Sequence, residues 1–142
     1  MTFDPSCLFC RIAAGQSPSY VVFEDEVSVA FLDHRPLRPG HCLLVPRQHV
    51  ETLYEAPPEL LGPLMLTAQR LAAAAERAMH ADGAFVAINV RVSQSVPHLH
   101  VHLVPRHRKD GLFARNFVWQ RRPYPDESAA VAAQDAIRAA LV

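Results

Sequence analysis

The sequence has no excess of charge of either sign, since 14 Lys and Arg residues balance 14 Asp and Glu residues. A neutral chain lacks the field with which proteins bind nucleic acids or anionic membrane surfaces, so neither partner is expected. No apolar run reaches the length that spans a bilayer, and Met1–Cys10 lacks the charged and apolar regions of a signal peptide. We therefore expect a cytoplasmic protein without a membrane partner.

Cysteine is also scarce, with three residues in the chain. Two of them form the spacing Cys7-x-x-Cys10, which fits a reducing compartment better than a disulfide framework. One Cys-x-x-Cys is half of a zinc site, and a redox pair or purely structural thiols are the alternatives. A zinc site here needs two further ligands.

The chain contains 142 residues, half of them hydrophobic, which is enough for one domain with a proper core. Hydrophobic periodicity and turn residues predict the secondary structure. The expected elements are a helical turn at residues 11–14, strands at 20–24, 27–32 and 41–45, a long helix at 59–80, strands at 84–88 and 97–105, and a final helix at 127–141.

The most informative strand is the run from Pro97 to Pro105, in which histidines alternate with aliphatic residues. Side chains on a strand point alternately to opposite faces, so His98, His100 and His102 are expected on one surface-facing side, about 6–7 Å apart. Three imidazoles in register suit a phosphate or a metal ion. Both ligands stay open at this point, because His-x-His on a strand also holds zinc.

Polar residues precede and basic residues follow this strand. The polar loop at 89–95 is expected beside the imidazoles because the short link predicts an antiparallel pair of strands. The basic segment at 106–122 contains six Lys and Arg residues, and Asp110 is its single acidic residue. It is either a solvated loop or a small anion-binding rim. The six are Arg106, Arg108, Lys109, Arg115, Arg121 and Arg122.

The run from Gln94 to Val104 resembles the signature of the histidine triad (HIT) family, His-x-His-x-His followed by apolar residues. Three upstream blocks resemble other parts of the family pattern in order and spacing, and together they cover roughly residues 7–106. These blocks are Cys7–Ile12, Ala30–Asp33 and Pro39–His49.

The resemblance implies a single HIT domain over residues 1–142, with a core at about 7–106 and a C-terminal extension at about 107–142. It implies an α+β, HIT-like fold in which an antiparallel five-stranded sheet carries one long helix, with a short C-terminal helix added. It also implies a homodimer whose sheets join across a two-fold axis.

By position, the resemblance implies an enzyme that acts at the α-phosphate of a nucleotide, with His100 as the nucleophile. His102 matches the group that contacts the phosphate, and His98 matches the first triad member. A neutral imidazole is a good nucleophile toward phosphorus, and charge on the phosphoryl oxygens calls for donors already in place. The other implied site residues are Gln94 and Ser95 as phosphate donors, Asn89 as a polar contact, Asp33 as the acceptor for ribose hydroxyls, and Phe9, Ile12 and Phe31 as the base pocket.

Zinc-containing members of the family have ligands at the positions of His49 and His98, so the resemblance implies a structural Zn²⁺ held by Cys7, Cys10, His49 and His98. Two other functions stay open. The histidine row could bind a catalytic metal, or the chain could be a non-catalytic nucleotide-binding or interaction protein.

Overall fold

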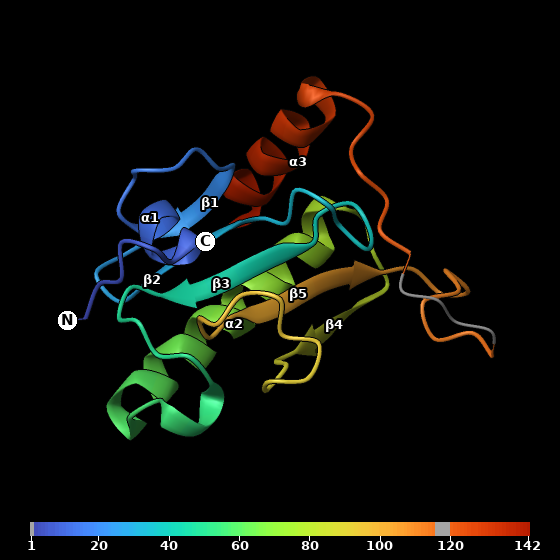
Figure 1. Cartoon of the computed structure of the whole chain (residues 1–142). Coiled ribbons are helices and arrows are strands. Elements are labelled where there is room, and N and C mark those ends of the chain that lie inside the picture. Colours follow the sequence, from blue (N-terminus) through green and yellow to red (C-terminus); the bar gives the residue numbers. More distant parts are fainter. Residues whose placement is uncertain (1, 116–119) are drawn as a thin grey trace.

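The computed structural model describes residues 2–115 and 120–142 of the chain, so Trp119 of the basic segment lies outside the described residues. Its centre is a five-stranded sheet in the order β1-β2-β3-β5-β4, with every neighbouring pair antiparallel (Figure 1). The strands are Val21–Glu24 (β1), Ser28–Leu32 (β2), Cys42–Pro46 (β3), Gly83–Ala87 (β4) and Val101–Arg106 (β5).

Three α-helices in the described part of the chain accompany the sheet. They are Leu8–Ala13 (α1), Pro58–Ala78 (α2) and Glu127–Ala140 (α3), with a 3-10 turn at Leu53–Glu55 (η1). Asp126 caps α3 by accepting a hydrogen bond from the Ala129 amide, which satisfies one of the free N–H groups of the first turn. No helix of the described residues combines the length and apolar character needed to cross a membrane.

The α+β fold class is confirmed, and the predicted elements are present, with ends that agree or differ by at most four residues. The turn between β1 and β2 forms at Asp25, whose carboxylate accepts hydrogen bonds from the amides of Val27 and Ser28. The C-terminal helix packs on α2 and β1 and completes the layer that covers one face of the sheet.

The two faces of the sheet bury two different clusters. Leu44, Val101 and Leu103 belong to the larger core, together with Leu64 and Leu71 of α2. On the opposite face a smaller cluster packs α1 against β2 and β3, and it contains Phe9, Cys10, Ile12, Val29, Phe31, Leu43 and Val45. The histidines alternate with the residues of the larger core, so their side chains reach the α1 face.

The prediction of one continuous histidine strand is wrong at its start, because β5 begins only at Val101. In the register of β3 and β5, Leu44 faces Val101, so Pro46 would face Leu99. Pro46 has no N–H for this ladder, and the Leu99 amide instead donates to the Val50 carbonyl at 2.8 Å. His98 and His100 therefore precede the strand, although the alternation of side chains continues through them.

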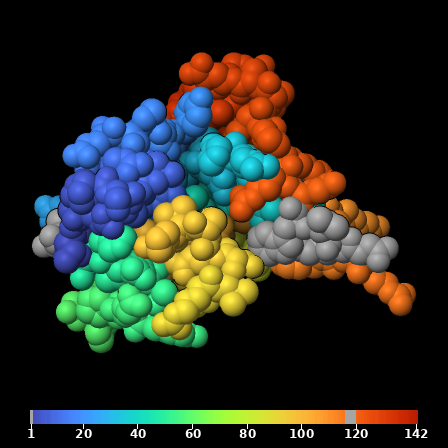
Figure 2. All heavy atoms as spheres, in the orientation of Figure 1, coloured from blue at the N-terminus to red at the C-terminus, as the bar shows by residue number. Residues whose placement is uncertain are grey.

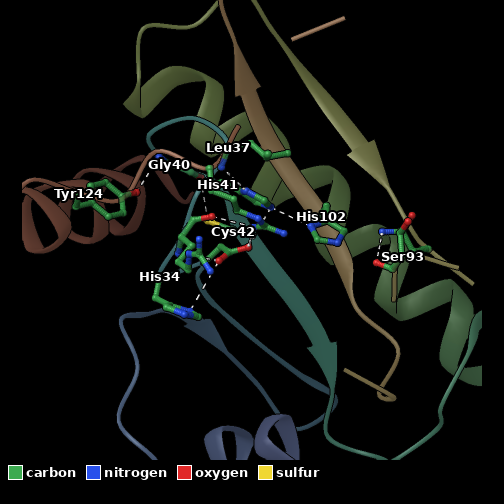
Figure 3. Close-up of polar contacts among 12 residues, drawn as sticks. His34, Leu37, Gly40, His41, Cys42, Ser93, His102 and Tyr124 are labelled. Carbon is green, nitrogen blue, oxygen red and sulfur yellow. Dashed lines mark hydrogen bonds and ion pairs between the residues drawn. The ribbon is translucent and has the colours of Figure 1, made fainter. Parts of the chain in front are cut away.

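The segment before α3 is tied to the loop between β2 and β3. The Arg122 amide donates to the Pro36 carbonyl at 2.7 Å, and the Gly40 amide donates to the Tyr124 hydroxyl at 2.9 Å (Figure 3). In the space-filling view, an orange part of the C-terminal segment lies against this cyan loop (Figure 2). These two hydrogen bonds hold residues 122–124 beside the end of β2.

Gly40 has a backbone φ of +89°, and a Cβ built on it would lie 2.6 Å from Met79 Cγ and 3.0 Å from Pro105 Cγ. We expect Gly40→Ala to lower the free energy of unfolding by about 1–3 kcal/mol, because it adds left-handed strain to a steric clash. Gly15→Ala is the matched control, since Gly15 has φ +74° and no atom within 4 Å of its would-be Cβ. Urea denaturation followed by circular dichroism should show the larger loss for Gly40→Ala, and equal losses would contradict the clash.

Candidate active site

A cavity of about 430 Å³ lies on the α1 face of the sheet, where the N-terminal segment, the loop after β2 and the loop before β5 meet (Figure 2). It brings together most of the predicted site residues from distant parts of the chain. Those that line it are Phe9, Ile12, Phe31, Asp33, Ser95, His100 and His102. One part of its wall is therefore apolar, and the other carries a carboxylate, a hydroxyl and two imidazoles.

A second cavity of about 330 Å³ adjoins the first. Its lining residues are Asn89, Ser93, Ser95, His102 and Arg121, of which the last three also line the first cavity. The Asn89 side chain donates to the Ser93 carbonyl at 3.3 Å, which holds the loop between β4 and β5 in place.

Like His98, the predicted site residue Gln94 lines neither cavity. Its side-chain nitrogen donates to the Glu51 carbonyl at 2.6 Å, and its side-chain oxygen accepts from the Arg91 amide. Arg91 and Ser93 both have positive φ, at 65° and 63°, and the loop turns between them. Gln94 thus ties the loop to the residues before η1.

His100 is buried, at 4% exposure, and does not face the surface as predicted. Its Nδ1 lies 2.8 Å from the His98 carbonyl oxygen, which can only accept, so the proton of the neutral ring sits on Nδ1. The ring also meets the Phe9 ring edge-on, with centroids 5.2 Å apart. Burial lowers the pKa of His100, so the ring is neutral near pH 7 with its lone pair on Nε2.

His102 is oriented by His41, a residue to which the sequence assigned no role. His41 Nδ1 accepts from the Leu37 amide at 3.1 Å, so its proton is on Nε2, which lies 2.9 Å from His102 Nδ1 (Figure 3). His102 therefore accepts at Nδ1 and carries its own proton on Nε2. Burial lowers the pKa of His41 to about 3 and that of His102 to about 4, so both rings are neutral near pH 7.

Asp33 is buried at the end of β2, and its carboxylate accepts two hydrogen bonds. Its Oδ1 accepts from the Arg35 amide at 2.9 Å, and its Oδ2 accepts from Arg121 Nη1 at 2.6 Å. Arg121 was predicted only as part of a basic segment. The contact of Arg121 with Asp33 joins residues 88 positions apart, so no local sequence pattern could have predicted it. His41 could have been selected from the sequence, because it is a histidine directly before an apolar strand.

Cys7, Cys10, His49 and His98 place one ligand atom each within 4.8 Å of one another. Cys7 caps α1, and the first helical turn brings Cys10 beside it, with the Cys10 amide 3.4 Å from Cys7 Sγ. His98 donates from Nε2 to the Pro46 carbonyl at 2.8 Å, so its Nδ1 lone pair points at the thiols. That atom lies 3.3 Å from Cys7 Sγ, 3.6 Å from Cys10 Sγ and 3.2 Å from His49 Nδ1.

These separations fit a tetrahedral zinc ion, whose bonds of about 2.0–2.3 Å put neighbouring nitrogen and sulfur ligands roughly 3.3–3.6 Å apart. The donor set of two thiols and two imidazoles is one that zinc prefers. By contrast, no group of mutually close ligands among the described residues contains all three triad histidines. His98 joins the cysteines, while His102 lies with Asp33 and His41.

Comparisons with known proteins agree with this architecture. The family model described as HIT domain matches residues 14–109. A Zn-bound histidine triad family protein from Mycobacterium smegmatis superposes with a TM-score of 0.82 at 37% identity, covering 96% of this chain and 93% of that one.

Two relatives have named activities. Adenosine 5′-monophosphoramidase HNT1 of Saccharomyces cerevisiae is 40% identical over 78% of this chain and 70% of its own length. Adenylylsulfatase HINT3 of Arabidopsis thaliana is 32% identical over 80% of this chain and 58% of its own length. With the family model spanning more than half of the chain and two of the triad histidines lining a cavity on the expected sheet face, the protein belongs to the histidine triad (HIT) family.

Proposed function

We propose that the protein is a nucleotide hydrolase or transferase that acts at the α-phosphate of a nucleoside 5′-phosphate derivative, a phosphoramidate or a dinucleoside polyphosphate, through a nucleotidyl-His100 intermediate. The observation that carries the proposal is the hydrogen bond from His100 Nδ1 to the His98 carbonyl. This bond leaves the Nε2 lone pair for a cavity that also holds a carboxylate and an apolar wall. The names of the two relatives, a phosphoramidase and an adenylylsulfatase, support the substrate class.

In the first step, His100 Nε2 attacks the α-phosphorus, a nitrogen–phosphorus bond forms, and the bond to the leaving group breaks. The ring becomes cationic, and the His98 carbonyl stabilises that charge through the Nδ1 proton, as does the nearby Asp33 carboxylate. In the second step, water attacks the phosphorus, the nitrogen–phosphorus bond breaks, and its electron pair returns to His100 Nε2. The products are the nucleoside monophosphate, neutral His100 and a proton from the water, which balances the proton that an amine leaving group takes up and otherwise passes to solvent. Two moderate displacements thus replace one difficult displacement.

His102 and Ser95 supply hydrogen-bond donors where charge develops on the phosphoryl oxygens. The chain of bonds from the Leu37 amide through His41 presents the His102 Nε2 proton to the cavities. Because this donor is set before the substrate arrives, no reorganisation is needed during the reaction.

The nucleoside occupies the first cavity in this proposal. Phe9, Ile12 and Phe31 surround the base, and the Phe9 and Phe31 rings pack edge-on with centroids 5.3 Å apart. Asp33 accepts the ribose hydroxyls, since one carboxylate can accept two donors at once. Asn89 contacts the substrate from the second cavity.

Zinc, in this proposal, is a structural ion held by Cys7, Cys10, His49 and His98. When bound, it contributes a closed tetrahedral link between α1 and the segment that leads into β5 and leaves no coordination position for a substrate. The reaction steps above use only side chains of this chain.

We propose further that residues 1–142 form a single domain, with a core at about 7–106 and an extension at about 107–142, and that two copies form a homodimer. Support for the dimer comes from β4, which ends the strand order of the described sheet and leaves Val86 44% exposed. An open edge of this kind can pair with a second copy. The cytoplasmic location stays a prediction from the sequence.

We expect peptide mass spectrometry of enzyme quenched without acid during turnover to find a nucleotidyl adduct on His100. His100→Ala would leave a cavity, because the ring is buried. His100→Asn is the better variant, since its side-chain amide keeps a donor for the His98 carbonyl and removes the nucleophile. It should retain nucleotide affinity within about threefold and lose turnover, and an adduct on another residue would refute the intermediate.

Asp33→Ala should weaken ribonucleotide binding by at least about tenfold, because the loss of a hydrogen bond to a charged group typically costs about 1.5–3 kcal/mol. Binding of the matching 2′-deoxy nucleotides should fall less, since they make fewer hydrogen bonds to this carboxylate. The comparison of the two nucleotides within one variant separates the ribose contact from any effect on folding. Equal losses for both would contradict the assigned role.

Protein purified without added metal should contain about one zinc ion per chain by elemental analysis. Cys10→Ala should abolish that zinc and lower the melting temperature. Cys42→Ala is the matched control, because Cys42 is buried in β3 outside the four-residue cluster and should leave the zinc content unchanged. Wild-type protein that is folded, reduced and free of zinc would overturn the structural-zinc proposal.

Two results would favour the alternative functions. Tight nucleotide binding without turnover of any α-phosphate substrate would indicate a non-catalytic binding protein. Turnover that stops at once with a chelator, while the protein stays folded, would indicate catalysis by a metal.

A further inference from the structure

Arg121 lies where the two cavities meet, and it comes from the C-terminal extension rather than from the triad segment or the sheet. It lines both cavities together with Ser95 and His102. Its side chain is 34% exposed, so the guanidinium reaches both the protein and the solvent in the cavities. The contacts of the catalytic proposal above do not use this residue.

The guanidinium is held in place from two sides. Nη1 donates to Asp33 Oδ2 at 2.6 Å and to the Arg35 carbonyl at 2.8 Å. The next residues of the chain are fixed by the Arg122 amide on the Pro36 carbonyl and by the Tyr124 hydroxyl on the Gly40 amide. Arg121 is therefore positioned before any ligand binds.

Both hydrogen bonds that Arg121 makes to described residues come from Nη1. Among the described residues, Nη2 and Nε have no hydrogen-bond partner, so their N–H groups can bind a ligand. A planar guanidinium with two such donors matches two oxygens of a phosphate or sulfate group. Its charge also reaches the triad, because it contributes, after burial, to the lowered pKa values of His100 and His102.

The second cavity suits an anion. The described residues that line it are an amide, two hydroxyls, one imidazole and Arg121, and none is acidic. Asp33, the carboxylate of the site, lines only the first cavity. A pocket with several hydrogen-bonding groups and one fixed cation favours an oxyanion over an amine.

The position of the nucleophile indicates which part of a substrate enters this cavity. His100 lines the first cavity but not the second, whereas His102 and Ser95 line both. In an in-line displacement the leaving group departs on the side of phosphorus opposite the nucleophile. A phosphorus atom beside His102 and Ser95, attacked by His100, would thus send its leaving group into the second cavity.

We propose that Arg121 is a specificity residue that binds an anionic leaving group, a phosphate chain or sulfate joined to the α-phosphate, and so favours acid anhydrides over phosphoramidates. The inference rests on the proposed function and adds to it the class of leaving group. Arg121 acts by contact with the leaving group, and the attack by His100 is the same for every substrate.

The test compares three adenosine substrates that share the α-phosphate. They are adenylyl sulfate, diadenosine tetraphosphate and the phosphoramidate, and the leaving group of the last is ammonia. In Arg121→Gln, kcat/KM should fall by about ten- to one-hundredfold for the two anhydrides, as expected for a lost hydrogen bond to a charged group. It should change by less than about threefold for the phosphoramidate. A loss with sulfate alone or with the phosphate chain alone identifies which oxyanion the guanidinium contacts.

Arg122→Gln is the matched control, because it removes the same charge one residue away and lines neither cavity. It should leave all three substrates unchanged. Arg121→Lys, which keeps the charge and loses the planar pair of donors, should lie between wild type and Arg121→Gln. An equal loss for all three substrates in Arg121→Gln would show that Arg121 acts through Asp33, and this would overturn the proposal, as would no loss for any.

A binding measurement keeps the inference separate from the proposed function. Calorimetry should show that wild type binds ADP more tightly than AMP, because the β-phosphate adds a contact. In Arg121→Gln, the ratio of ADP affinity to AMP affinity should fall by at least about tenfold. If wild type turns over none of the substrates, the proposed function fails while the ratio of ADP to AMP affinities still tests Arg121. An unchanged ratio would refute the anion contact.

Discussion

The structure of the site depends on how His98 is held. Its ring donates from Nε2 to the Pro46 carbonyl at the end of β3, which turns Nδ1 toward Cys7, Cys10 and His49. Its backbone carbonyl accepts the Nδ1 proton of His100. One residue thus orients the cluster that joins α1 to the sheet and determines which nitrogen of His100 carries the lone pair. The N-terminal segment and the reactive imidazole are linked through a single side chain and its own carbonyl.

Burial and directed hydrogen bonds together determine the protonation of the imidazoles. Desolvation disfavours the cationic form of each ring, and the backbone partners then select one tautomer of the neutral form. The Leu37 amide selects the tautomer of His41, and His41 in turn selects that of His102. The His98 carbonyl selects the tautomer of His100 directly. As a result a ring with a free lone pair and a ring with a free N–H stand side by side, with centroids 4.9 Å apart. The strand spacing predicted a larger separation, of about 6–7 Å, because it assumed rings held straight out from a regular strand.

Local pattern predicted the elements and the face on which the triad lies. The alternating pattern predicts the correct face for His98 and His100 although both precede β5. A period of two requires only an extended backbone and not a hydrogen-bonded ladder. The local sequence pattern did not predict two features of the site. The direction of the Gln94 side chain depends on positive φ at Arg91 and Ser93, which ordinary side chains rarely adopt. The contact of Arg121 with Asp33 depends on where a segment far along the chain passes the loop after β2, and no spacing within either segment encodes it.

The two cavities divide the site between different parts of the chain. Residues before β3 supply the apolar wall and the carboxylate of the first cavity, whereas the loop between β4 and β5 and the C-terminal extension supply most of the second. His102, Ser95 and Arg121 line both cavities, so these three side chains lie at the boundary between them. A change in the loop or in the extension can alter the second cavity without moving His98, His100 or the residues that orient them. The extension is tied to the loop after β2 by the Arg122 amide and the Tyr124 hydroxyl, and Arg121 itself is fixed by its hydrogen bonds to Asp33 and to the Arg35 carbonyl. A terminal segment outside the sheet can therefore contribute a preorganised group to the site while the triad keeps its geometry.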